Sequence, residues 1–234
     1  FVNHRFLADY LRQQAVGRFA DAEFAARCTV IDPAIDRTRF FPELERASGP
    51  RRLLFYARPR SGKRNLFELG VAALQRAAQF GAFAHEPWEF LAIGDKIEAV
   101  ALGNGHTLRP APWLEFDDYA RQMRRADLLL SLMLSPHPSY PPLEMAACGG
   151  LVVTNAYGGK TQARFSEISP NILAPKATIE GISDGLLAAA ARVGDLERRR
   201  RGSQLPVPAS WDESFVTVLP RAIAAFTECR GVRS

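Results

Sequence analysis

Three basic residues and a glycine gather in one short segment of this sequence. Arg58, Lys63 and Arg64 lie around Ser61 and Gly62, directly after an apolar run and directly before a segment with helical periodicity. The first N–H groups of a helix lack partners within the helix and carry a partial positive charge, so basic side chains beside them favour an anion. A solvated basic loop has the same composition, and spacing alone does not separate the two interpretations.

A second polar group follows the apolar run at residues 128–134. The loop after this run contains His137, Ser139 and Tyr140, and Glu144 follows in the first turn of a predicted helix. The loop therefore brings a second helix start, with its unpaired N–H groups, to the end of a strand. Considered alone, Glu144 is best explained as an acid that complements the helix dipole.

The elements that must position these groups alternate from residue 51 onward. Short apolar runs predict strands at residues 52–57, 88–94, 97–103, 128–134, 151–155 and 171–175. Helical periods predict helices at residues 65–81, 116–127, 143–150, 178–201 and 211–229. Asn65 and Glu68 form a predicted capping box at the first of these helices, and Pro220 interrupts the last. This alternation predicts an α/β fold with a doubly wound parallel sheet and helices on both faces, which binds ligands at the carboxyl ends of its strands.

Composition and charge exclude several classes of function. The chain has 234 residues, of which 47% are hydrophobic, and a formal net charge of +5 whose basic side is almost all arginine. The arginines form no stripe with interleaved aromatics, so no nucleic-acid partner is expected. No apolar run approaches the roughly 20 residues of a membrane span. The cysteines and histidines are too scattered for a metal site or a disulfide framework, which favours a reducing cytoplasm and predicts no metal.

Together, the two polar groups resemble the C-terminal, donor-binding domain of GT-B glycosyltransferases of the large group 1 family, whose donor loops read GR-x4-KG and E-x7-E. In YARPRSGKRN, Arg58 and Lys63 have the spacing of the family's diphosphate-binding pair. In PHPSYPPLEMAACGG, Glu144 falls on the second acidic position, which holds the ribose, whereas Pro136 replaces the first. The variant is most similar to rhamnosyltransferases of bacterial surface-polysaccharide and S-layer glycan assembly, whose donor is dTDP-rhamnose.

The resemblance implies a Rossmann-like fold and transfer of a hexose, with rhamnose as the expected sugar, from a nucleotide diphosphate to a hydroxyl of a glycan or lipid-linked glycan. It implies that Arg58 and Lys63 act in catalysis by stabilising the leaving diphosphate. Six further residues are implied in donor binding: Arg64, Gly94, His137, Ser139, Tyr140 and Glu144. Ser139 and Tyr140 would meet the distal phosphate through their backbone N–H groups. His137 either takes over a sugar contact or is a solvent-facing loop residue. No cofactor and no metal are implied.

The resemblance covers nearly the whole chain and implies how it is divided. Residues 1–49 are expected to be a remnant of the N-terminal acceptor domain plus the interdomain linker. Residues 50–210 would form the nucleotide-sugar-binding domain, and residues 211–234 a crossover helix. Such a chain is expected to bind nucleotide without turnover, in the cytoplasm or at the inner face of the membrane. Peripheral membrane association through the missing domain and a homo-oligomer are both compatible with the resemblance. The base, the acceptor and the stereochemical outcome stay open.

Two alternatives remain from the sequence. The same loops could belong to a non-catalytic nucleotide-binding or regulatory α/β domain. In addition, TNAYGGKT at residues 154–161 comes within one residue of the P-loop pattern, with Thr154 in place of the first glycine. It is not followed by a long apolar-periodic helix and does not follow the first strand of its domain. A P-loop NTPase is therefore disfavoured, and the turn is expected to be a loop near the donor.

Overall fold

The computed structural model describes residues 1–45, 49–60, 64–216 and 218–231. Its strands are β1 (Val2–Asn3), β2 (Val30–Ile31), β3 (Arg51–Ala57), β4 (Trp88–Gly94), β5 (Val100–Gly103), β6 (His106–Pro110), β7 (Leu128–Leu130), β8 (Leu151–Val153) and β9 (Ile172–Leu173). Its helices are α1 (Arg5–Gln13), the 3-10 helix η1 (Gly17–Ala20), α2 (Ala22–Arg27), α3 (Phe67–Gln79), α4 (Phe116–Arg125), α5 (Tyr140–Ala147), α6 (Gln162–Ile168), α7 (Ile179–Ala190), α8 (Leu196–Gly202), α9 (Trp211–Phe215) and α10 (Val218–Gly231).

Seven strands form one sheet in the order β5-β6-β4-β3-β7-β8-β9. All neighbouring strands pair in parallel except β5, which pairs antiparallel with β6 at one edge. The chain builds outward from β3 through β4 to β6, then crosses to the other side of β3 and continues through β7, β8 and β9. The strand order therefore reverses between β3 and β7, which is where open α/β sheets bind their ligands.

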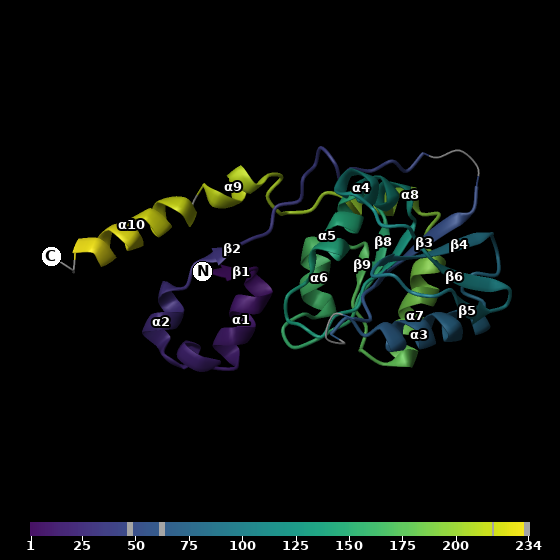
Figure 1. Ribbon diagram of the computed structural model, residues 1–234, viewed down its shortest axis with the longest axis horizontal. Coiled ribbons are helices and arrows are strands. Elements are labelled where there is room, and N and C mark those ends of the chain that lie inside the picture. The colour runs from purple at the N-terminus through teal and green to yellow at the C-terminus, as the bar shows by residue number, and fades with distance from the viewer. Residues whose placement is uncertain (46–48, 61–63, 217, 232–234) are drawn as a thin grey trace.

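The centre of the sheet is covered on both faces. On β3, Leu53 and Phe55 point into the core beneath α3 and α7, and Leu54 points into the core beneath α4 and α5. Figure 1 shows α3 and α7 lying together on one side of the strands and α5 on the other. A strand buried on both faces needs a continuous apolar run, which explains why its sequence does not alternate. The predicted doubly wound, Rossmann-like α/β sheet is confirmed.

Three local predictions are wrong. Asn65 does not cap α3, because the N-cap is Leu66 in a left-handed conformation without a side-chain hydrogen bond, and the Asn65 amide donates instead to the carbonyl of Leu132. The helix predicted over residues 178–201 is two helices, since Asp195 caps a new helix, α8. The terminal helix is not interrupted at Pro220, because α10 begins at Val218. Pro220 therefore lies in the first turn of α10, where its missing N–H costs nothing.

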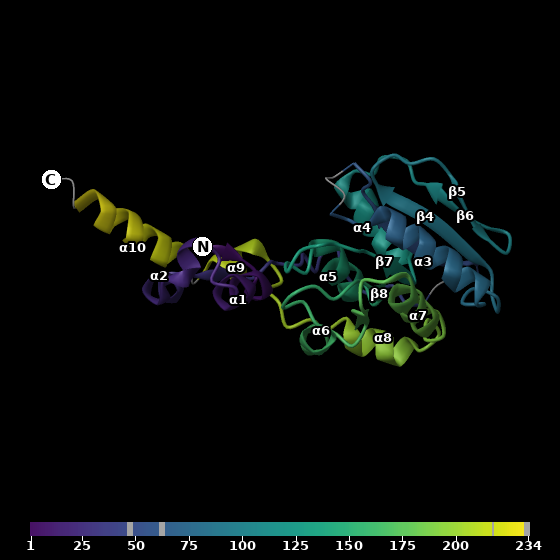
Figure 2. The same cartoon turned by 90° about the horizontal axis from the view of Figure 1, so that it is seen from below.

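The first residues of the chain form a small unit of their own. β1 and β2 pair in parallel, with α1 and α2 between them in the sequence. In both views this unit and α10 extend to one side of the sheet (Figures 1 and 2). Phe6 packs edge-on against Phe165 of α6, and Arg164 forms an ion pair with Asp9 at 2.6 Å. No described helix is long and apolar enough to cross a membrane.

Candidate functional site

A cleft of about 1250 Å³ opens at the carboxyl ends of β3, β4 and β7. It lies at the reversal of strand order, with the start of α5 on one side and the segment leading into α4 on the other. Every predicted site residue that the structure describes lines this cleft: Arg58, Arg64, Gly94, His137, Ser139, Tyr140 and Glu144. The sheet therefore brings together residues that are up to 86 positions apart in the sequence.

Arg58 follows directly after β3 and is held loosely. Its side chain is 37% exposed, and its Nε lies 3.9 Å from the carboxylate of Asp95. A further contact, of 3.5 Å, joins its guanidinium to the hydroxyl of Tyr56. An arginine with long, partly exposed contacts can turn toward an incoming anion at little cost, because no short hydrogen bond has to break.

Gly94 lets the ends of β3 and β4 come together beside Arg58. Its φ is +113°, and a Cβ there would lie 2.8 Å from the carbonyl oxygen of Ala57 and 3.0 Å from Cγ of Arg58. Both the backbone conformation and the space at this position therefore require glycine. Gly94 shapes the cleft by allowing this close approach.

Arg64 is exposed at the cleft, and its carbonyl accepts a hydrogen bond of 2.8 Å from the N–H of Leu134. This contact ties the basic segment to the loop after β7. Lys63, predicted to act with Arg58, lies outside the described residues together with Ser61 and Gly62. The roles of these residues stay predictions.

The start of α5 differs from the expected row of free N–H groups. Pro141 and Pro142 lie in its first turn and have no N–H to offer. The N–H of Ser139, expected at the distal phosphate, donates to Nδ1 of His137 at 3.0 Å. Ser139 itself has a φ of +69°, an uncommon conformation for a residue other than glycine. The N–H of Tyr140 is then the donor that the helix start can present to the cleft.

His137 takes up one of the N–H groups at this helix start. Burial, and then the ammonium of Lys160, lower the pKa of His137 to about 4, so its ring is neutral near pH 7. Because Nδ1 accepts the N–H of Ser139, the ring proton resides on Nε2. That Nε2 is buried and has no hydrogen-bond partner among the described residues. The neutral ring thus carries one unpaired N–H that is buried behind the cleft wall. His137 is therefore not the solvent-facing loop residue that the sequence left open as an alternative to a sugar contact.

Glu144 lies deeper than a dipole-complementing acid would. Its side chain is only 9% exposed, and Oε2 accepts a hydrogen bond of 2.6 Å from the hydroxyl of Tyr119 on α4. Burial raises the pKa of Glu144 to about 7, and the Tyr119 hydrogen bond partly offsets this rise. A buried carboxylate that faces a cleft and has one fixed partner suits hydrogen bonding to ligand hydroxyls.

Sequence reasoning gave no role to several residues of the cleft, among them Tyr119, Trp113 and Asn3. Tyr119 lies one turn into α4, four residues beyond the N-cap Glu115. The helix was predicted, but no role was predicted for this tyrosine. Trp113 is 83% exposed on the segment leading into α4 and lines the cleft. Asn3 comes from the N-terminal unit and lies 3.4 Å from the hydroxyl of Tyr140. No sequence signal marked these three residues, because exposure and position at the cleft follow from the tertiary structure.

The glycine-rich turn that approached the P-loop pattern does not cradle an anion. Lys160 is fully buried, and its Nζ donates to the carbonyl of Met133 at 2.9 Å, behind the loop that follows β7. Burial lowers the pKa of Lys160 to about 7. The turn packs beside α1, where Gly158 faces the ring of Tyr10. The P-loop alternative therefore fails on geometry.

Comparisons with known proteins agree with this arrangement. The model of the family described as "WsaF, C-terminal domain" matches residues 51–187. The O-antigen biosynthesis protein RfbC of Myxococcus xanthus is 40% identical over 124 residues, which are 53% of this chain and 9% of that protein. The chain thus spans a small part of that relative's length.

Solved structures show the same fold. A glycosyltransferase from Rickettsia africae ESF-5 superposes with a TM-score of 0.60 at 15% identity, covering 85% of this chain and 55% of that one. WaaG, a glycosyltransferase involved in lipopolysaccharide biosynthesis, gives a TM-score of 0.56 at 16% identity, covering 83% of this chain and 55% of that one. The sheet described above is accordingly the GT-B type of Rossmann-like fold.

Proposed function

Because the chain belongs to the WsaF C-terminal domain family, we propose that it is the donor-binding part of a GT-B glycosyltransferase of polysaccharide biosynthesis. One observation carries this proposal: residues chosen from two separate sequence motifs line one cleft at the reversal of strand order. The name of the Myxococcus relative, an O-antigen biosynthesis protein, supports a cell-surface glycan as the product. Since the chain spans about half of the compared glycosyltransferase structures, transfer by the whole protein is part of the proposal.

The proposed donor is dTDP-rhamnose, and the proposed acceptor is a hydroxyl of a glycan or lipid-linked glycan. In the transfer, the bond between C1 of the sugar and the distal phosphate oxygen breaks, the acceptor oxygen bonds to C1, and the acceptor hydroxyl gives its proton to a base or to the departing diphosphate. Negative charge develops on the departing phosphate oxygen. Arg58 and Lys63 would stabilise that charge, which is the electrostatic form of catalysis. Glu144 would hold the sugar of the nucleotide.

Arg58→Ala tests the diphosphate contact. Charge-assisted hydrogen bonds contribute roughly 1.5 to 3 kcal/mol each, so the variant should bind dTDP at least about tenfold more weakly than the unchanged protein. Isothermal titration with dTDP, UDP, GDP and dTDP-rhamnose measures this and ranks the nucleotides. The matched control is Arg192→Ala, since Arg192 is an exposed arginine that does not line the cleft.

Equal affinity of the Arg58→Ala and Arg192→Ala variants for dTDP would contradict the diphosphate assignment. We also propose that binding needs no divalent metal, because two cationic side chains would face the diphosphate. Titration after chelation with EDTA should then give the same affinity. A large loss of affinity after chelation would assign the charge neutralisation to a metal instead.

A further inference from the structure

Lys160 is a buried ionisable group that the proposed transfer does not use. It ends a tight turn, in which its backbone N–H and carbonyl pair with those of Tyr157 at 2.9 and 3.0 Å. Its side chain is fully buried, and none of the carboxylates that the structure describes forms an ion pair with it. Buried charges in proteins are as a rule paired, so a buried lysine without a carboxylate needs an explanation.

The backbone of Met133 is held from behind by two buried side chains. Oδ1 of Asn155 accepts the Met133 N–H at 2.7 Å, and Nδ2 of Asn155 donates to the Met133 carbonyl at 3.3 Å. Nζ of Lys160 donates to the same carbonyl at 2.9 Å. Asn155 and Lys160 follow β8, whereas Met133 follows β7 and lines the cleft. The segment after one strand therefore fixes the loop after the neighbouring strand.

The same loop receives the basic segment that follows β3. The N–H of Leu134 donates to the carbonyl of Arg64 at 2.8 Å, and the side-chain amide of Asn65 donates to the carbonyl of Leu132 at 3.4 Å. The two polar segments of the cleft therefore meet on either side of Met133, whose carbonyl the buried amine holds.

A lysine at this position costs stability at neutral pH. Burial lowers the pKa of Lys160 from its ordinary 10.5 to about 7. Between these two values the unfolded chain binds more protons at this residue than the folded protein does, so the stability rises with pH from about 7 to about 10.5 and the cost is largest below pH 7. A methionine would fill a similar space without this cost. Packing alone therefore does not account for the lysine, and such residues beside a cleft are candidates for a function.

We propose that Lys160 is a positioning residue for the diphosphate of the donor: its ammonium holds the carbonyl of Met133 and, through this loop, sets the two polar segments that the diphosphate contacts. The inference rests on the proposed function, in which a diphosphate lies in the cleft. In a buried setting of low dielectric constant, an anion nearby favours the ammonium over the neutral amine. Binding of the donor is therefore coupled to protonation of Lys160.

The titratable and charged groups packed around Lys160 come from three other elements. His137, on the loop after β7, has a pKa of about 4, which burial and then the Lys160 ammonium lower. His4, before α1, lies 5.6 Å from His137 between ring centroids, and burial lowers its pKa to about 3. Arg164 of α6 donates to the turn at the carbonyl of Gly159 and forms an ion pair with Asp9 of α1. A change in donor binding between pH 6.5 and pH 8.5 is therefore not due to the two histidines.

Lys160→Met tests the inference with dTDP-rhamnose, whose diphosphate carries the sugar and has no ionisation near neutral pH. If the diphosphate raises the pKa of Lys160 by about one unit, the variant should bind roughly fivefold to tenfold more weakly than the unchanged protein at pH 6.5, and within about twofold of it at pH 8.5. Isothermal titration at the two pH values measures both affinities. Their ratio at each pH cancels the contribution of Glu144, which also titrates in this range.

The control is Lys176→Met, the same change at an exposed lysine that does not line the cleft, and it should bind like the unchanged protein at both pH values. Lys160→Gln, which keeps a neutral donor, should show the same pH-dependent loss and replaces Lys160→Met if that variant does not fold. Unchanged affinity of the Lys160 variants at pH 6.5, or a loss by the same factor at both pH values, would overturn the inference alone. If the unchanged protein binds none of dTDP-rhamnose, UDP-glucose and GDP-mannose, the proposed function fails and the inference fails with it.

Discussion

Glu144 is held in the cleft at the expense of the fold. Its pKa is raised to about 7 chiefly by burial, whereas the ordinary pKa of a glutamate, as in the unfolded chain, is about 4.5. Between these two values the unfolded chain binds fewer protons at this residue than the folded protein does. The stability that the raised pKa implies is present below about pH 4.5 and is lost as the pH rises through about 7.

Glu144→Gln should consequently stabilise the protein in a pH-dependent way. The amide cannot ionise, and its oxygen can still accept the hydroxyl of Tyr119. Relative to the unchanged protein, the variant should gain on the order of 2 to 3 kcal/mol between pH 4 and pH 8, because one pKa unit corresponds to 1.36 kcal/mol. Urea unfolding of both proteins at the two pH values measures the difference. The same difference in stability at pH 4 and pH 8 would show that Glu144 is not buried as a charge.

At the scale of elements, the cleft depends on how the ends of β3 and β4 approach each other. Parallel pairing brings Ala57 beside Gly94, so the last residue of each strand lies next to that of its neighbour. Arg58 then emerges at the cleft with Gly94 beneath its side chain. The glycine is required by both its positive φ and the carbonyl of Ala57.

Gly94→Ala should destabilise the protein by about 2 to 4 kcal/mol, because the added Cβ combines backbone strain with a contact against a rigid carbonyl. It should also weaken nucleotide binding, since the Cβ displaces Arg58. The control is Gly105→Ala, where φ is +79° but nothing lies within 4 Å of the added Cβ. That variant should show the strain alone, about 1 to 2 kcal/mol. Unfolding in urea and titration with dTDP measure both effects, and equal losses in the two variants would argue against the contact.

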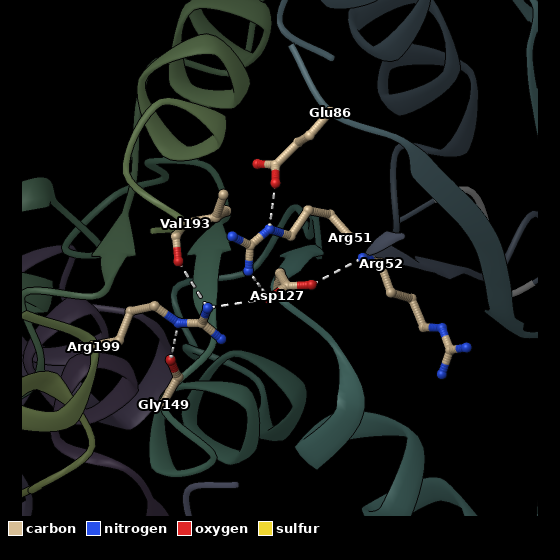
Figure 3. A network of polar contacts seen from close by, with 7 residues as sticks. All are labelled: Arg51, Arg52, Glu86, Asp127, Gly149, Val193 and Arg199. Atoms are coloured by element: carbon tan, nitrogen blue, oxygen red, sulfur yellow. Dashed lines mark hydrogen bonds and ion pairs between the residues drawn. The ribbon is translucent and has the colours of Figure 1, made fainter. Parts of the chain in front are cut away.

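At the scale of the whole molecule, a buried ion pair and the predicted site lie at opposite ends of the strands. Figure 3 shows Asp127 between Arg51 and Arg199 at the amino ends of β3 and β7. The Arg199 guanidinium lies 3.1 Å from Asp127 and also donates to the carbonyls of Gly149 and Val193. Arg199 and Asp127 are both buried, so the pair joins the sheet to α8. A second cleft of about 1170 Å³ lies at this end of the strands, and none of the predicted site residues that the structure describes lines it.

Arg199→Met should therefore lower stability without touching the site. Removing one partner of a buried, hydrogen-bonded ion pair costs about 3 to 5 kcal/mol, because the other charge stays buried. The affinity of the folded variant for dTDP should stay within about twofold of the unchanged value. Arg201→Met, at an exposed helix pair with Glu197, is the control and should change stability by less than about 0.5 kcal/mol. A loss of affinity for dTDP in Arg199→Met would mean that the buried ion pair at the amino ends of the strands is coupled to the cleft at their carboxyl ends.

Much of the fold could be predicted because its signals are local. The apolar run at residues 52–57 and the periodicity of the following helix each depend on neighbouring residues, and their alternation restricts the topology to a doubly wound sheet. The helix break before Asp195 was not predicted, because the arginines that follow continue a helical pattern. Its cap is a single side-chain contact, to the N–H of Arg198.

The sequence by itself determined the sheet, its covered faces and which loops follow its strands, since these depend on hydrophobic periodicity and on the rule that parallel strands end at one edge. Only the tertiary structure decided what the site residues contact. Tyr119 and Glu144 are 25 positions apart and meet because α4 and α5 pack side by side on the sheet. His137 became a neutral donor because burial and the geometry of its loop fixed its proton on Nε2. Burial and packing between distant elements create these properties, and no spacing along the chain encodes them.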